Sequence, residues 1–88
     1  MINGKTESGF EFGIKEEVLD DYELLEVLGK VDRGEVGYVP DMVEMLLGTE
    51  QKNRLKAHIR KEHGRITVTD MINEVMQIFN ANKELKNS

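Results

Sequence analysis

Apolar residues recur at α-helical spacing in three successive stretches of the second half of the chain, and a glycine separates each pair. We expect one short helix over 41–47, a second over 49–63 and a third over 68–80. Gly48 and Gly64 stand where the first two patterns stop. Because glycine adopts the backbone conformation that commonly ends a helix, both positions predict helix C-termini.

The third of these helices has a complete start signal. With Thr67 as its N-cap, the Thr67 hydroxyl can accept from the backbone N–H of Asp70, whose carboxylate can reach back to the Thr67 N–H. Ile66 and Met71 occupy the two positions of a hydrophobic staple. The apolar residues of this helix form a wide face that we expect to be buried: Val68, Met71, Ile72, Val75, Ile78 and Phe79.

An earlier helix is expected to begin after Asp20 or Asp21, either of which can cap it, and to end near 29–31. Its expected apolar stripe comprises Tyr22, Leu24, Leu25, Val27, Leu28 and Val31. Pro40 suits the first turn of the 41–47 helix. That short helix is apolar on nearly all sides, so we expect it at the centre of the core.

The N-terminal part has a strand pattern, because Phe10, Phe12 and Ile14 alternate with other residues and share one face. A single strand lacks a hydrogen-bonding partner. Three arrangements are open: an extended arm packed on the helices, pairing with the segment 36–39, or addition to a partner's sheet. We favour the packed arm.

The 88 residues support one hydrophobic core, and therefore one domain. We expect a flexible N-terminus over 1–8, although Met1 and Ile2 could pair with another segment, a single helical domain over 9–80 and a flexible tail over 81–88. The expected fold class is all-α: a compact bundle of about four short helices with a short extended N-terminal arm.

Composition narrows the setting of the protein. The chain has no cysteine, and it has neither a signal-peptide h-region nor an apolar run near the roughly 20 residues that cross a membrane. We therefore expect a non-secreted, cytoplasmic protein. Five methionines and no tryptophan indicate a core filled by flexible side chains, or a surface that adapts to a partner.

Charge is divided unevenly along the chain. Residues 1–50 hold 4 Lys and Arg and 13 Asp and Glu, a net charge of −9, whereas residues 51–65 hold 6 basic residues and one Glu, a net of +5. Lys52, Lys56 and Arg60 line up one helical turn apart. The favoured interpretation is a solvated face, and the second is a docking site for a protein partner. Nucleic acid is disfavoured, because the acidic half would repel it and no aromatic residue interleaves the basic ones.

The sequence indicates no catalytic or cofactor chemistry. It has no phosphate-binding glycine loop, nucleophile elbow or zinc-protease motif. His58 and His63 are five residues apart, so on one helix they point in different directions rather than toward one metal ion. The acidic pairs before helices are typical of capping and solvated charge. We therefore expect a protein that is not an enzyme and has no cofactor or metal.

Several segments carry a resemblance to a known family. These segments consist of helix caps and core positions. They are residues 10–12 (FEF), 20–26 (DDYELLE), 46–51 (LLGTEQ) and 63–66 (HGRI) leading into Met71. On these segments the chain resembles, from Gly9 to Phe79, the small tail assembly chaperones of long-tailed phages and prophages of Gram-positive bacteria. The resemblance implies an all-helical, non-enzymatic protein that binds the tape measure protein while the tail tube assembles around it.

The resemblance has no sharp binding motif, so the candidate partner-binding residues come from this sequence alone. They are adaptable methionines and the basic row: Met42, Met45, Lys52, Lys56, Arg60 and Met76. The expected partner is the tape measure protein or another tail protein. The alternatives are a small bacterial or prophage regulatory adaptor that binds another protein and, less favoured, a nucleic-acid-binding module.

Overall fold

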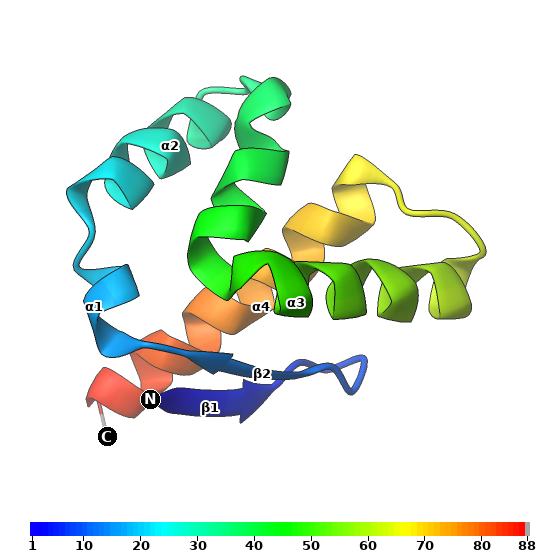
Figure 1. The fold of residues 1–88 in the computed structure, drawn as a ribbon, viewed down its shortest axis with the longest axis horizontal. Helices are drawn as coiled ribbons and strands as arrows, with labels where there is room; N and C mark the ends of the chain where they lie inside the picture. Colours follow the sequence, from blue (N-terminus) through cyan, green and yellow to red (C-terminus); the bar gives the residue numbers. More distant parts are fainter. Residues whose placement is uncertain (88) are drawn as a thin grey trace.

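The computed structural model describes the backbone of residues 1–87 and the side chains of residues 1–81. Figure 1 shows a β-hairpin closing one end of a group of helices. The elements follow the order β1 (Ile2–Lys5), β2 (Glu11–Ile14), α1 (Glu16–Leu19), α2 (Tyr22–Asp32), the 3-10 helix η1 (Val36–Tyr38), α3 (Val39–His63) and α4 (Val68–Asn87). None of the described helices combines the length and the hydrophobicity needed to cross a bilayer.

The expected all-α fold class is wrong, because the N-terminal segment forms a two-stranded antiparallel sheet. β1 pairs with β2 in a register that places Ile2 opposite Ile14 and Gly4 opposite Phe12. The Thr6 N–H donates to the Phe10 carbonyl at 2.9 Å and closes the turn. Residues 1–8, expected to be a flexible end, therefore provide β1 and most of the turn, and the extended arm has its partner within the chain.

The first strand escapes a search for alternating hydrophobicity because Ile2 is its only large apolar residue. It contributes by pairing its backbone with β2 and by leaving room for a side chain of that strand. A Cβ atom at Gly4 would lie 2.6 Å from Cζ of Phe12, so glycine leaves room for that ring. Gly9, with φ of 95°, makes the turn in a conformation that other residues rarely adopt. Phe12 itself is buried, as are Phe10 and Ile14, so the predicted apolar face of this strand is confirmed.

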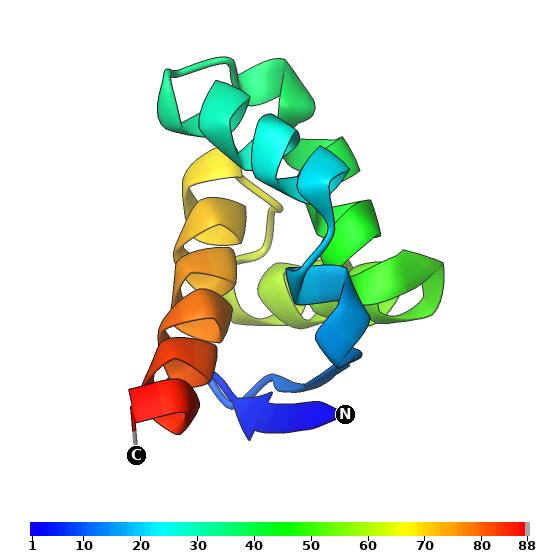
Figure 2. The same ribbon diagram turned by 90° about the vertical axis from the view of Figure 1, so that its left-hand side faces the viewer.

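Helix α2 begins where one of the two predicted caps stands. The Asp21 side chain accepts from the backbone N–H groups of Glu23 (2.8 Å) and Leu24 (3.4 Å). Leu24 is buried, but Tyr22 and Leu25 are 72 % and 63 % exposed, so the predicted apolar stripe is wider than the face that packs. Figure 2 shows α2 across the upper part of the molecule with no other element in front of it, so one side of the helix faces away from the rest of the fold.

Helix α3 consists of two arms joined at a sharp bend (Figure 1). Gly48, at φ 81° and ψ 165°, has a non-helical backbone between the arms, so the predicted break there is confirmed. The first arm includes Pro40 in its first turn, and the second ends at Gly64 in the left-handed conformation, as predicted. The direction of the chain therefore changes at a single residue, without a loop.

Helix α4 starts at the predicted residue with one of the two predicted capping bonds, since none of the hydrogen bonds among the described residues joins the Thr67 N–H to the Asp70 carboxylate. The Asp70 N–H donates to Thr67 Oγ1 at 3.0 Å, and the Met71 N–H donates to the Thr67 carbonyl at the same distance. Its backbone continues to Asn87, beyond the expected end at residue 80. Of the tail expected over 81–88, only Ala81 has a described side chain, and Ser88 lies outside the described residues.

The core lies between the hairpin, the two arms of α3 and α4. It is formed by fourteen buried apolar residues: Phe10, Phe12, Ile14, Leu24, Val39, Met42, Val43, Leu46, Leu47, Leu55, Ile59, Met71, Val75 and Ile78. Leu55 and Ile59 are the buried aliphatic residues of the second arm of α3, which therefore packs through the narrow stripe that its sequence predicts.

A side-chain amide from α3 holds the hairpin against the helices. The N–H of Gly13 donates to Gln51 Oε1 at 2.8 Å, and Gln51 Nε2 donates to the Gly13 carbonyl at 2.7 Å. In an antiparallel pair alternate residues turn their backbone groups away from the partner strand, and Gly13 is one of them. Gln51 therefore takes the place that a third strand would occupy on β2.

A buried carboxylate holds the hairpin turn against α4. Glu74 is 7 % exposed, and its oxygens accept from the hydroxyls of Thr6 (2.9 Å) and Ser8 (2.9 Å). The Glu7 N–H donates to the side-chain oxygen of Gln77, one turn further along α4. Since a buried carboxylate is costly unless it is hydrogen-bonded, these hydroxyls and Glu74 stabilise one another.

We expect Thr67→Ala to lower the free energy of unfolding by about 1 kcal/mol, because the Asp70 N–H loses its partner at the helix start. Chemical denaturation monitored by circular dichroism measures the change. Thr69→Ala, an exposed position two residues further on, is the matched control and should stay within roughly 0.5 kcal/mol of the parent. Equal effects of the two substitutions would place the cap elsewhere.

We expect Glu74→Ala to lower the free energy of unfolding by about 1–3 kcal/mol, because the buried Thr6 hydroxyl loses its acceptor. Asn73→Ala, at an exposed neighbouring position of α4, serves as the control. In Thr6→Val/Glu74→Ala both partners are gone, so its loss should be smaller than the sum of the two single losses. Strictly additive losses would show that the two side chains do not interact.

Candidate partner-binding groove

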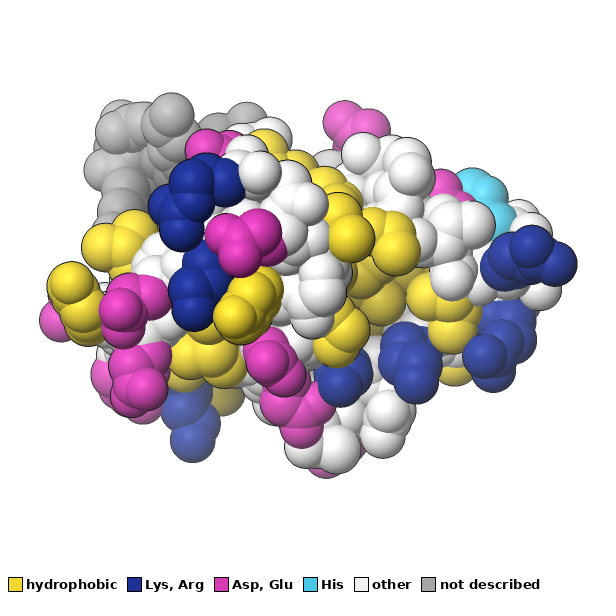
Figure 3. Space-filling model, turned by 90° about the horizontal axis from the view of Figure 1, so that it is seen from above, with side chains coloured by type: hydrophobic (Ala, Val, Ile, Leu, Met, Phe, Trp, Pro, Cys, Tyr) yellow, Lys and Arg dark blue, Asp and Glu magenta, His cyan; other side chains and the backbone are white. Residues whose placement is uncertain are grey.

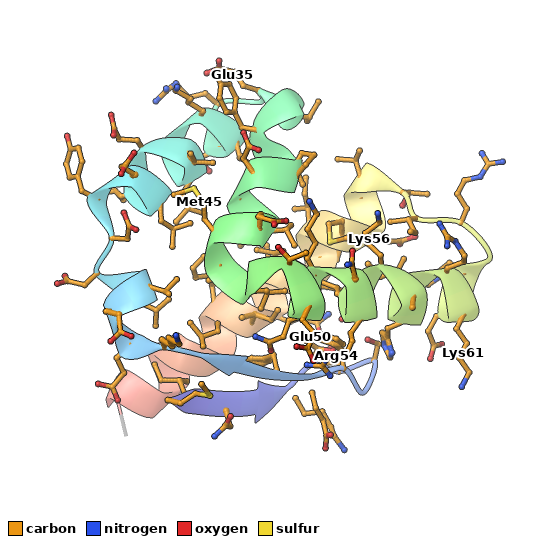
Figure 4. The ribbon with its side chains drawn as sticks, in the orientation of Figure 1. Glu35, Met45, Glu50, Arg54, Lys56 and Lys61 are labelled. Carbon is orange, nitrogen blue, oxygen red and sulfur yellow. The ribbon has the colours of Figure 1, made fainter. Side chains whose placement is uncertain are left out.

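The structure separates the three candidate methionines. Met42 is 3 % exposed and belongs to the core, so little of its side chain is accessible to a partner. Met45 is half-buried and lies between α2 and the first arm of α3 (Figure 4). Met76 is 54 % exposed on α4, at the rim of a separate cavity of about 450 Å³ between α2 and α4.

The candidate lysines lie together at an apolar groove. The groove is a cavity of about 310 Å³ bounded by η1 and the first arm of α3, the second arm of α3, and the start of α4. Its apolar lining comprises Val36, Val39, Pro40, Val43, Ile66, Val68 and Met71. Lys52 and Lys56 line the same cavity from the second arm of α3. We call this site the lysine groove.

The bend in α3 creates the lysine groove. Because the chain turns at Gly48, the two arms of one helix provide two of the walls, Val39 and Val43 from the first and Lys52 and Lys56 from the second. The segment after Gly64 brings Ile66 and the start of α4 across the open side. Figure 3 shows hydrophobic side chains gathered in a hollow of this face with Lys and Arg side chains along one side of it.

The basic residues of the second arm of α3 divide between two sides. Lys52 and Lys56 lie at the groove, whereas Arg54 and Lys61 line a shallow depression beside Phe10 of the hairpin. The guanidinium carbon of Arg54 lies 5.4 Å from the centre of the Phe10 ring, close enough for a cation–π contact. Figure 4 shows the same division, with Lys56 on the side of α3 that faces the start of α4.

The charges at the groove are not equivalent. Lys52 Nζ lies 3.0 Å from Glu44 Oε2, and only 26 % of its side chain is exposed, so its charge is already paired. Lys56 and Arg60 make no ion pair with the described side chains, and both are exposed. Arg60 continues the row but does not line the cavity. Lys56 is therefore the lining residue whose positive charge is available to a ligand.

A hydrogen bond from Thr49 to Glu44 fixes the acidic partner of Lys52. The pKa of Glu44 lies below its ordinary value, first because its carboxylate accepts from the Thr49 hydroxyl and next because it accepts from Lys52. The three residues lie on both sides of Gly48, so this small network also spans the bend. The same carboxylate pairs with Lys52 at the groove.

A second polar cluster, which the sequence did not indicate, lies beside the hairpin turn. Ser8 Oγ is 2.9 Å from His58 Nε2 and 2.9 Å from Glu74 Oε2. A hydroxyl has one proton, and only a donor can bond to the carboxylate, so Ser8 donates to Glu74 and accepts from His58. A serine nucleophile needs the opposite arrangement, in which histidine accepts the hydroxyl proton. The geometry therefore suits attachment of the hairpin rather than acyl transfer.

No three His, Asp or Glu side chains among residues 1–81 gather closely enough to hold a metal ion. The cavity next to Ser8 has a volume of about 180 Å³ and a mainly polar lining that includes His58, Glu62, His63 and Glu74. The lysine groove is the larger and more apolar of these two sites. Of these two sites it is therefore the better candidate for binding another molecule.

Comparisons of the chain with protein-family models, curated proteins and solved structures found no match. The resemblance to tail assembly chaperones consequently depends on the short segments quoted above, and function has to be argued from the surface of this chain.

We expect nuclear magnetic resonance titration to place the Glu44 carboxyl below the ordinary pKa of 4.5. Because the folded-state pKa is lowered, Glu44 contributes stability above its unfolded pKa, and this contribution is lost as pH falls through the folded pKa. Thr49→Ala should raise the pKa toward 4.5, since it removes the largest cause of the shift. An unchanged pKa in Thr49→Ala would contradict this assignment.

Proposed function

We propose that this protein is a non-enzymatic tail assembly chaperone of a phage or prophage, which binds the tape measure protein in the cytoplasm of the bacterial host during tail morphogenesis. The observation that supports the proposal best is the lysine groove, an apolar cavity with a cationic rim on an otherwise acidic chain. The tape measure protein is proposed as the partner because short segments of the chain resemble the chaperone family.

A tape measure protein presents the kind of surface that this groove suits. The resemblance implies a long helical partner whose apolar stripes are exposed before the tail tube encloses it. A groove between helices binds such a stripe by inserting the apolar side chains of one helical face. The lysine groove provides the apolar lining for these side chains, and Val36 and Val68 at its edge are 53 % and 49 % exposed in the chain alone.

The rest of the surface favours reversible binding. Residues 1–50 have a net charge of −9, which limits nonspecific association of the chain with nucleic acid. A cavity of about 310 Å³ accepts only a few side chains of a partner, so the binding free energy gained there is limited. A chaperone that must leave when the tube assembles needs such contacts.

A regulatory adaptor that binds a different bacterial protein is the second candidate, because the same groove would serve it. The nucleic-acid-binding alternative is less favoured. Of the row Lys52, Lys56 and Arg60, Lys52 is paired with Glu44, which leaves two cations in that row for phosphates. The groove lining also contains no aromatic residue on which a base could stack.

Co-expression with the tape measure protein of the same phage or prophage genome tests the proposal. We expect the soluble fraction of the tape measure protein to rise and the two proteins to purify together in an affinity pull-down. A small acidic protein of unrelated sequence, expressed from the same vector, is the control. If the tape measure protein is equally insoluble with either protein and purifies with neither, the proposal is wrong.

A further inference from the structure

We propose that the lysine groove binds an amphipathic helix whose acidic residues, one turn apart, lie along one border of its apolar face. This inference rests on the part of the proposed function that makes the groove a protein-binding site. It adds the chemical character of the bound segment and the border of that segment that faces α3. The distribution of charge and apolar surface around the groove supports it.

The two sides of the groove differ in character. On one side the second arm of α3 presents Lys52 and Lys56, one helical turn apart. On the other side η1 and the start of α4 present Val36 and Val68, both about half exposed. A ligand that fills the groove therefore meets cations along one border and apolar surface along the other.

This asymmetry matches a bound helix that has acidic residues along one border of its apolar face. It disfavours a bound helix with a uniformly apolar or a basic face. Acidic residues one turn apart on a bound helix have the same spacing as Lys52 and Lys56. Complementary charges favour the encounter and determine which border of the helix faces α3. Because Glu44 already pairs with Lys52, most of the charge selectivity should come from Lys56.

The chain provides a matched control for general electrostatics. Lys61 lies on the same arm of α3 as Lys56 and is also exposed, but it faces the hairpin side and does not line the groove. Lys56→Glu and Lys61→Glu change the net charge equally. Only the first changes the charge beside the apolar lining, so a local effect can be separated from the overall field.

Fluorescence anisotropy with labelled synthetic 18-residue peptides tests the inference on the full chain. The acidic peptide carries leucines on one helical face and two glutamates one turn apart beside them, and the basic peptide has lysines in place of those glutamates. The parent protein should bind the acidic peptide about tenfold more tightly, roughly 1.4 kcal/mol in binding free energy. Lys56→Glu should reverse the preference, and Lys61→Glu should retain it.

Two further reagents test the apolar side and the helical form. Val68→Asp introduces an acid at the exposed first residue of α4, which a helix N-terminus tolerates, so circular dichroism should show an unchanged fold while the acidic peptide binds at least about tenfold more weakly. The same acidic peptide with a central proline cannot form a continuous helix and should also lose affinity.

Three results would overturn the inference: equal affinity of the parent for acidic and basic peptides, equal effects of Lys56→Glu and Lys61→Glu, or undiminished binding of the proline peptide. These results are separable from failure of the proposed function. If the tape measure protein purifies with the parent and equally with Lys56→Glu, the chaperone proposal stands and the helix inference fails. If the peptides behave as expected but the tape measure protein does not purify with the chain, only the choice of partner fails.

Discussion

The bend at Gly48 is the constraint on which most of the structure depends. A backbone at φ 81° and ψ 165° divides α3 into two arms without a connecting loop. Both arms contribute to one core, with Leu46 and Leu47 before the bend and Leu55 and Ile59 after it. The lysine groove lies in the angle between them. A side chain at position 48 would favour a different backbone conformation, so both the core and the groove depend on glycine at this position.

Two polar side chains then attach the hairpin to this bent helix and to its neighbour. Gln51, three residues after the bend, bonds to both backbone groups of Gly13 in β2. Glu74 of α4 receives the hydroxyls of the hairpin turn. The hairpin covers one end of the core with Phe10, Phe12 and Ile14, so its attachment also determines how much apolar surface is buried. A small chain with one core depends on such links between distant segments.

The same geometry determines where the basic residues lie on the surface. Six basic residues fall within 51–65, and α3, which contains five of them, directs them to different sides. Lys52 and Lys56 border the apolar groove, while Arg54 packs over Phe10 and Lys61 lies nearby. What a ligand meets at the groove is therefore a short cationic border beside apolar surface. That arrangement suits a helix face better than it suits a phosphate backbone.

Local interactions could be predicted from the sequence, and long-range ones could not. The caps at Asp21 and Thr67 and the break at Gly48 depend on neighbouring residues, so the spacing of residue types was sufficient to identify them. The hairpin, the Thr6–Glu74 bond across 68 residues and the lysine groove depend on contacts between distant segments. β1 has a nearly featureless sequence because its stability comes from pairing, and the burial of Met42 depends on the elements that pack against the first arm of α3. The sequence by itself determined the helix starts at Asp21 and Thr67 and the break at Gly48, because these depend on neighbouring residues. The tertiary structure decided which helical residues remain available to a partner, because burial depends on what packs against each face.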